Sequence, residues 1–303
     1  MTVKRKKKTT ATAPSIQNGF SLISNEKLLQ LYATMLKCRM LEERIRSLRK
    51  KSKLQGNAVA MGQEAAAAGV ILNLGPEDTI APLPGDVIAG FIKGVPLNEI
   101  FAGLRAPVPM CHAPLHVLPA CSSLPTQLAL AAGVALAGKM EKNSRISVVF
   151  CGDMYPLPEL CLEALRFAGV HRLPILHVCW NSRPEADIAL QTQACGFPCI
   201  AVDGNDAVAV YRVASEAIAH ARKGNGPTLI ECKTGIDPGP VEEHPQSTGD
   251  PLLNMEKYLA RKGLFSEESK RQIAAGFGRE LDSAGKSARK IATSQKTLKR
   301  STW

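Results

Sequence analysis

The sequence predicts an α/β fold with a doubly wound, mostly parallel sheet that carries helices on both faces. Three observations support this prediction. Four short runs are apolar at almost every position, as expected of strands that are buried on both faces. Helical segments separate these runs, so strand and helix alternate in the way that is typical of parallel crossovers. The length of 303 residues suits one large domain or two small ones.

The predicted strands cover residues 145–151, 174–180, 199–202 and 227–234. The helices expected between them cover residues 124–140, 157–169 and 206–223. Because ligands of such sheets bind beyond the carboxyl ends of the strands, the residues that follow the first two strands are candidates for a site. These are Gly152 and Asp153 after one strand, and Asn181 and Ser182 after the next.

Further helices are expected on either side of this central region. From Asn25 to Leu48, apolar residues recur every three or four positions, which predicts a long helix with one apolar stripe. Two shorter helices are expected at residues 62–72, which are rich in alanine, and at residues 96–104. Towards the C-terminus we expect a loop and then two helices, the second of which begins at Ser266. The C-terminal part is therefore a helical extension of the α/β domain.

The formal net charge of +11 is located at the two ends of the chain. Residues 1–8 carry five basic side chains and residues 285–303 carry six, without an acidic residue in either stretch. The remaining 27 Lys and Arg equal the 27 Asp and Glu, which argues against a specific nucleic-acid surface, although a basic arm could touch polyanions non-specifically. We expect a disordered basic arm at 1–24, an α/β domain at 25–284 and a basic tail at 285–303.

Cysteine usage and hydropathy indicate a cytoplasmic protein without membrane association. The nine cysteines form no CxxC pair, and several lie inside apolar runs, as expected of buried thiols in a reducing compartment. The apolar runs are far shorter than the roughly 20 residues that span a bilayer. The N-terminus lacks the apolar segment of a secretory signal, and its basic stretch lacks the amphipathic pattern of an organellar transit peptide.

The polar residues at the two strand ends could hold a hard cation. Asp153 brings a carboxylate to the sheet edge, and Asn181 or Ser182 brings an amide or hydroxyl oxygen to the neighbouring strand end. The alternative is that Asp153 caps the following helix and Asn181 forms a turn. The spacing of these residues leaves both interpretations open.

Weaker candidates lie elsewhere in the chain. Potential zinc ligands gather at Cys111, His112, His116 and Cys121, but nearby prolines exclude a helix that would face both histidines. Glu242, Glu243 and His244 could form an acid/base loop, although proline-rich polar loops usually face solvent only. Asn205 or Asp206 is expected to cap the helix that follows it. No GxGxxG or GxxxxGK[ST] phosphate loop is present in the sequence.

Long stretches resemble the α subunit of thiamine-diphosphate-dependent 2-oxo acid dehydrogenases of the pyruvate and branched-chain type. The resemblance runs from about residue 26 to 280, through stretches such as MGQEAAAAGVILNLGPED, RISVVFCGD and LEALRFAGVHRLPILHVCWN. It implies the thiamine-diphosphate-binding fold and the decarboxylation of a small 2-oxo acid such as pyruvate, with lipoamide as acceptor. It also implies a β-type partner subunit, in a hetero-oligomer, with a homodimer as the other possibility.

In that family, a GDG opening and a closing pair of asparagines bracket the segment that binds the diphosphate through magnesium. The resemblance places Gly152, Asp153 and Met154 at the opening, and Asn181 and Ser182 at the close, with Asp153 and Ser182 at the metal-ligand positions. Met154 replaces a glycine that would permit close backbone approach. Ser182 replaces an asparagine, and its oxygen reaches about one bond length, ~1.5 Å, less far.

Two further family segments are changed. The family's Tyr-Arg-x-His segment aligns with residues 84–87, which read Pro-Gly-Asp-Val, so each side chain is replaced. The Arg-Gly-His-Ser loop should follow Thr234, where only His244 could take over a catalytic role. These losses predict an α-subunit-like chain with weakened or lost activity, the alternative being a non-catalytic paralogue that acts as a structural or regulatory partner subunit. The resemblance also places the small residues of 65–68 and 125–138 at subunit interfaces.

Overall fold

The computed structural model describes residues 23–52, 62–104, 111–152, 154, 157–183, 187–234 and 249–300. The expected N-terminal arm lies outside these residues except for Ile23 and Ser24. Asp153, and the loop that contains Glu242, Glu243 and His244, also lie outside them.

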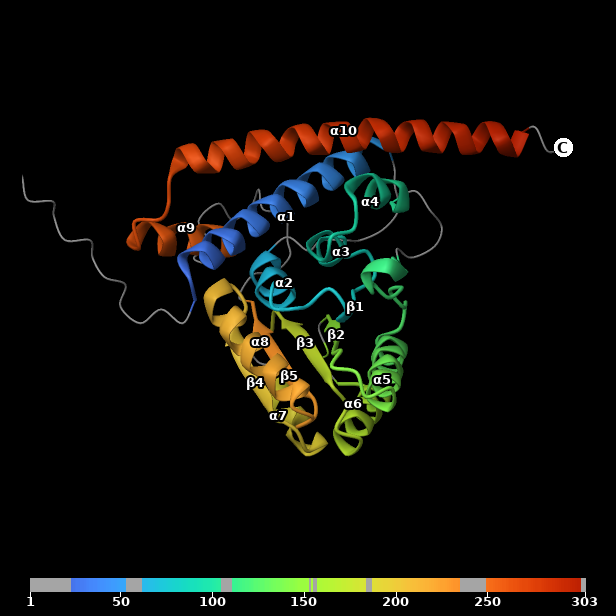
Figure 1. Ribbon diagram of the computed structural model, residues 1–303, viewed down its shortest axis with the longest axis vertical. Helices are drawn as coiled ribbons and strands as arrows, with labels where there is room; N and C mark the ends of the chain where they lie inside the picture. Colours follow the sequence, from blue (N-terminus) through green and yellow to red (C-terminus); the bar gives the residue numbers. More distant parts are fainter. Residues whose placement is uncertain are drawn as a thin grey trace, which may run out of the picture.

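A parallel sheet forms the centre of the described chain, with its strands in the order β1-β2-β3-β5-β4 (Figure 1). The strands are β1 (Thr79–Ala81), β2 (Ser147–Cys151), β3 (Ile175–Asn181), β4 (Cys199–Asp203) and β5 (Thr228–Lys233). The parallel sheet and the four predicted strands are confirmed. The sequence did not predict β1, because three residues are too short for a visible pattern.

Helices surround the sheet and form a separate group beyond its carboxyl end (Figure 1). They are α1 (Asn25–Ser52), α2 (Glu64–Ile71), α3 (Ile88–Lys93), α4 (Leu97–Gly103), α5 (Leu124–Met140), α6 (Glu159–Val170), α7 (Ile188–Thr192), α8 (Ala207–Arg222), α9 (Pro251–Arg261) and α10 (Glu267–Arg300), with 3-10 turns at Ala113–Leu115 and Gln193–Cys195. The helices predicted from the sequence are confirmed, whereas the short α3 and α7 were not predicted.

The apolar strands are buried because each face of the sheet packs on helices. On β2, Val148 and Phe150 belong to the cluster formed with α2 and α8, whereas Val149 and Cys151 belong to the cluster formed with α5 and α6. The edge strand β4 is the exception, since Ile200 remains 36% exposed. The expectation that residues 199–202 are covered on both faces was therefore wrong, because the helices leave part of this strand exposed to solvent.

The small residues of α2 serve packing within the chain. Ala65–Ala68 are fully buried, and a Cβ added at Gly69 would lie 2.8 Å from the Cγ1 atom of Val210 on α8. The expectation that Ala65–Ala68 lie at a subunit interface was wrong, because helices of the same chain cover them. The small residues on the outer side of α5 remain exposed, at Ala129, Gly133 and Ala137.

The C-terminal helix α10 lies across α1 and α4 (Figure 1). Its docked part contributes Phe277 and Leu281 to the core, and it continues to Arg300 within the basic tail. Within the ranges that the structure describes, no helix combines the length and the apolar character needed to cross a membrane.

Candidate functional site

The ends of β2 and β3 lie next to each other, as the crossover predicts. Cys151 is paired in register with Cys179, two residues before the end of β3 at Asn181. The carbonyl oxygen of Gly152 accepts a hydrogen bond from the thiol of Cys179 at 3.4 Å. A Cβ at Gly152 would lie 3.8 Å from Leu83, which brings the segment after β1 to the same sheet edge. The proximity of Asp153 to Asn181 stays a prediction, since Asp153 lies outside the described residues.

Asn181 is buried, and its carboxamide is used inside the chain. Its Nδ2 donates to Oε1 of Glu231 on β5, and its Oδ1 accepts the main-chain amide of Arg183 at 2.9 Å. Glu231 is fully buried and also accepts the main-chain amide of Ala189 on α7 at 2.9 Å. Asn181 therefore forms a turn and ties β3 to β5. Ser182, the next residue, is half-buried.

Met154 is buried beneath the strand ends. Its side chain is 1% exposed and belongs to the apolar cluster on the α5 and α6 face, together with Cys151, Cys161 and Cys179. Its main-chain amide hydrogen-bonds to the sulfur of Cys179. Burial holds the pKa of Cys151 and Cys179 above the usual range, so these thiols are protonated and unreactive near neutral pH. Met154 thus contributes to the packing of the apolar cluster beneath these strand ends.

The segment at residues 84–87 carries a buried carboxyl group. Oδ1 of Asp86 accepts the main-chain amides of Ile88 and Ala89, at 3.0 and 3.2 Å, and so caps the first turn of α3. Oδ2 is buried and has no hydrogen-bond partner in the described part of the chain. Burial raises the pKa of Asp86 to about 6, although the two amides oppose this effect. The segment at residues 84–87 therefore contains a buried carboxyl group with one oxygen that is unpaired among the described residues, and no basic side chain.

Glu42 of α1 adds a second buried carboxyl group to this region. Its side chain is 2% exposed, and its Oε1 has no partner among the described residues. Burial, and then the charge of Asp86, raise the pKa of Glu42 to about 8. The burial of Glu42 was not predicted, because a charged residue beside an apolar stripe is normally assigned to the solvent-facing side. The apolar residues Leu41 and Ile45, on the same stretch of α1, are a signal that could have indicated it.

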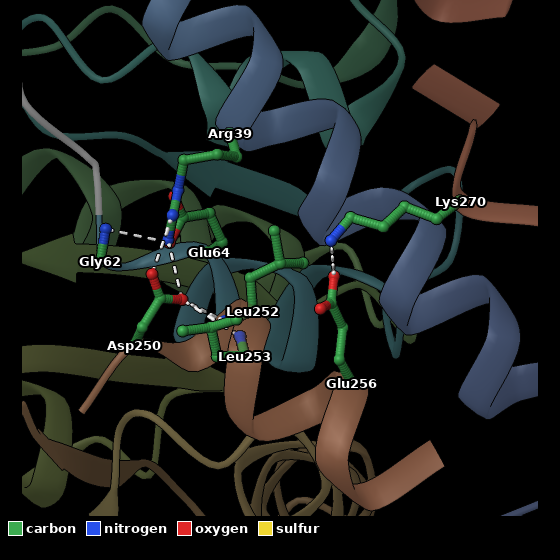
Figure 2. Close-up of polar contacts among 8 residues, drawn as sticks. All are labelled: Arg39, Gly62, Glu64, Asp250, Leu252, Leu253, Glu256 and Lys270. Carbon is green, nitrogen blue, oxygen red and sulfur yellow. Dashed lines mark hydrogen bonds and ion pairs between the residues drawn. The ribbon is translucent and has the colours of Figure 1, made fainter. Parts of the chain in front are cut away.

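An ion-pair cluster links the N-terminal helix to the C-terminal part of the chain, as Figure 2 shows. Arg39 of α1 contacts Glu64 of α2 at 2.5 Å and Asp250, which precedes α9, at 3.0 Å. Burial alone would raise the pKa of Asp250, but the hydrogen bond and charge of Arg39 lower it. Nearby, Lys270 pairs with Glu256 at 2.8 Å. Glu64 and Asp250 lie 25 and 211 residues from Arg39 in the sequence, so no local spacing predicts these two contacts.

The residues considered for zinc do not form one site. Nε2 of His112 lies 3.5 Å from a carboxylate oxygen of Glu99, and Nε2 of His116 lies 3.5 Å from one of Glu77. Cys111 is exposed. Within the described ranges, no group of three or more His, Cys, Asp or Glu side chains is arranged to hold a metal ion. The expected cap at the β4 and α8 junction is present, because Asp206 accepts the amides of Val208 and Ala209.

Comparison with known proteins assigns a family to this arrangement. Residues 32–235 match the family described as dehydrogenase E1 component. The chain is similar to 2-oxoisovalerate dehydrogenase subunit alpha of Bacillus subtilis (strain 168), with 30% identity over 284 residues, 81% of this chain and 86% of that protein. It is also similar to pyruvate dehydrogenase E1 component subunit alpha of Staphylococcus aureus (strain Mu50), with 30% identity over 292 residues, 88% of this chain and 79% of that protein. The subunit of the same description from Acholeplasma laidlawii is 28% identical over 277 residues, 83% of this chain and 80% of that protein.

Proposed function

The chain belongs to the dehydrogenase E1 component family, and we propose that it is an α-type subunit whose binding of thiamine diphosphate and magnesium is weakened or lost. In the family, the cofactor supplies the electron sink for decarboxylation of a 2-oxo acid, and the protein supplies binding and orientation. The contribution of this chain therefore depends on whether its residues can hold the cofactor.

The state of Asn181 is the observation that carries the proposal. A magnesium ion needs oxygen ligands at about 2.1 Å in near-octahedral geometry. The carboxamide oxygen of Asn181 already accepts the amide of Arg183, and its nitrogen already donates to Glu231. One lone pair of this oxygen is therefore engaged in the turn after β3, and the hydrogen bonds to Arg183 and Glu231 fix the orientation of the carboxamide. The other candidate ligand is the hydroxyl oxygen of Ser182, and the serine side chain is shorter than that of asparagine.

The electrostatics of the same region also support weak binding. A diphosphate requires hydrogen-bond donors or cations, whereas Asp86 presents a buried oxygen that can only accept while the carboxyl is ionised. Met154 fills its position with a packed side chain. These features of the described residues support weak binding of a diphosphate and magnesium. No reaction step is assigned to the chain on its own.

Assembly with a β-type subunit is the second part of the proposal. The C-terminal ends of α5 and α6 lie together, because the Lys139 ammonium donates to the carbonyl oxygen of His171 at 2.6 Å. Large apolar side chains are exposed there, with Met140 76% and Val170 80% exposed. A partner subunit that covered these exposed apolar side chains would remove them from water. A non-catalytic paralogue that pairs with a β-type subunit would keep this surface as well. The surface therefore supports assembly whether the chain is a weakened enzyme subunit or a non-catalytic one.

Co-purification with a β-type chain, followed by a turnover assay, tests this proposal. We expect a complex larger than the 32.5 kDa chain in sedimentation, and turnover of pyruvate or a branched 2-oxo acid at least 100-fold below that of a complex built on an α chain with the complete motif. The matched control is the same β preparation with that complete α chain. Equal turnover, or a chain that stays monomeric with each β-type partner tried, would contradict the proposal.

A further inference from the structure

A cavity of about 590 Å³ opens between α9 and the loop that joins β4 to α8. This volume lies within the range of about 300–1,000 Å³ that is usual for small-molecule sites. The cavity lies at the carboxyl end of the edge strand β4, and β5 separates that strand from β3 and Asn181. It is therefore distinct from the sheet edge at Gly152 and Asn181.

One wall of the cavity is acidic, and its side chains are held in place. Asp203 accepts the main-chain amide of Asn205 at 2.9 Å. Asp206 accepts the amides of Val208 and Ala209, at 2.9 and 3.0 Å, at the start of α8. Both acids line the cavity and are exposed at its mouth. Because Asp206 already occupies the N-terminus of α8, a free anion would meet two carboxylates on this side.

The opposite wall is basic. Lys257 and Arg261 lie one turn apart on α9, so both side chains project from the same side of the helix into the lining of the cavity. Both are exposed. A ligand with only a positive charge would be repelled here, as an anion would be on the other wall.

The floor of the cavity combines apolar side chains with one buried amide. Val208 and Met255 are 6% and 3% exposed and line the cavity from α8 and α9. Asn205 also lines it and is 6% exposed, and its buried Oδ1 has no hydrogen-bond partner in the described part of the chain. An unpaired buried polar atom destabilises the fold unless a partner is supplied. A donor on a bound molecule would satisfy it once the amide turns towards the cavity.

We infer that this cavity binds a small zwitterion with an aliphatic body, of which a free α-amino acid such as L-leucine is the simplest example. The ammonium group would meet Asp203 and Asp206, and the carboxylate would meet Lys257 and Arg261. The aliphatic side chain would lie on Val208 and Met255. Such a ligand matches both walls at once, whereas an ion of either single charge matches one wall and is repelled by the other.

Calorimetric titration of the full chain with three molecules of nearly equal shape tests the inference. The probes are L-leucine, 3-methylbutylamine, which lacks the carboxylate, and 4-methylpentanoate, which lacks the ammonium group. We expect L-leucine to bind about tenfold or more tightly than either single-charge probe, because each loses one charged contact. Absence of leucine binding, or equal affinity for the three probes, would overturn the inference.

A charge-reversal variant gives a second test in which binding is gained as well as lost. In the double variant Lys257→Glu and Arg261→Glu, both walls are acidic, so L-leucine should bind at least tenfold more weakly and 3-methylbutylamine more tightly than in the native chain. The matched control is Arg271→Glu with Arg279→Glu, at two exposed positions of α10 that do not line the cavity. An equal loss in the control, or an unchanged preference in the cavity variant, would contradict the assigned site. A melting temperature on each variant confirms that it is folded, and neither titration involves thiamine diphosphate, so the outcome is independent of the proposed function.

Discussion

At the scale of single residues, the acids buried between α1 and α3 make stability depend on pH. Glu42 has a pKa of about 8 in the folded chain, whereas an unperturbed glutamate titrates near 4.3. Between these values the folded protein keeps a proton that the unfolded chain releases. Stability is therefore fully present below about pH 4 and is lost as pH rises towards 8. Asp86, with a pKa of about 6, adds to the lower part of this loss.

The substitution Glu42→Gln tests this assignment. The variant keeps the shape of the side chain but carries no charge, so the free energy of unfolding should exceed that of the native chain by on the order of 2–4 kcal/mol at pH 8 to 9. The difference should shrink as pH falls to about 4.5. Urea unfolding at several pH values measures it. Glu43→Gln, at the exposed neighbouring position, is the control and should give no such pH-dependent difference.

The substitutions Met154→Gly and Ser182→Asn would introduce the glycine and the asparagine that the resemblance to the family implies at these two positions. Met154→Gly removes a buried side chain and should cost about 2–5 kcal/mol of stability through the cavity left behind. Together with Ser182→Asn it should raise the affinity for thiamine diphosphate and magnesium by about tenfold or more. If the two substitutions together bring no gain, the cofactor affinity is limited instead by residues 84–87 and by the loop after Thr234. Ser182→Asn alone serves as the variant that keeps the core intact.

At the scale of elements, the contact of Arg39 with Glu64 and Asp250 holds α1, α2 and the start of α9 together. Arg39→Ala would leave the fully buried Glu64 carboxylate without its cation, so we expect a loss of about 3–5 kcal/mol in the free energy of unfolding. Arg44→Ala is the matched control on the same helix. Its partner Asp282 is 59% exposed, so that ion pair should contribute about 1 kcal/mol or less. Equal losses of stability in the two variants would show that the buried ion pairs of Arg39 stabilise the fold no more than the exposed ion pair of Arg44.

The helices and strands that could be predicted are those in which a pattern of apolar residues extends over many positions. The stripe of α1 and the apolar runs of β2, β3 and β5 cover five or more residues each, and the structure contains all of them. The strand β1 and the helix α3 were missed, because three and six residues give too little periodicity. Asp86 is the residue that could have indicated α3, since its carboxylate accepts the amides of the first turn.

The site was predictable only in part, because several of its contacts join residues that are far apart in the sequence. The position of Asn181 at a strand end follows from the pattern of β3. Its engagement with Glu231 does not, because the two residues are 50 positions apart and meet only through the pairing of β3 with β5. The same holds for Arg39 and its distant partners. Contacts made by the sheet order and by helix packing, rather than by local spacing, decide which polar groups remain available to a ligand.

At the scale of the whole molecule, we expect the charged ends to be separable from the folded body. Residues 1–20 lie outside the described chain, and Leu281 is the last buried apolar residue among the α10 side chains that the structure describes. Deletion of residues 1–20 and 288–303 should therefore change the melting temperature by a few degrees at most, as expected for a loss below about 1 kcal/mol. Differential scanning calorimetry measures this change. A large decrease would mean that the ends dock on the body.

The central claim is that this chain has kept the fold of an α-type subunit while its hold on thiamine diphosphate and magnesium has weakened. Calorimetric titration of the full chain with both, in the presence of a β-type subunit, tests it most directly. We predict binding at least 100-fold weaker than that of a complex built on an α chain with the complete motif, because the resemblance implies the loss of two or more supporting residues, at about 10 to 100-fold each. Tight binding that disappears in Asp153→Ala would contradict the claim, since it would show that the remaining residues hold the cofactor despite these losses.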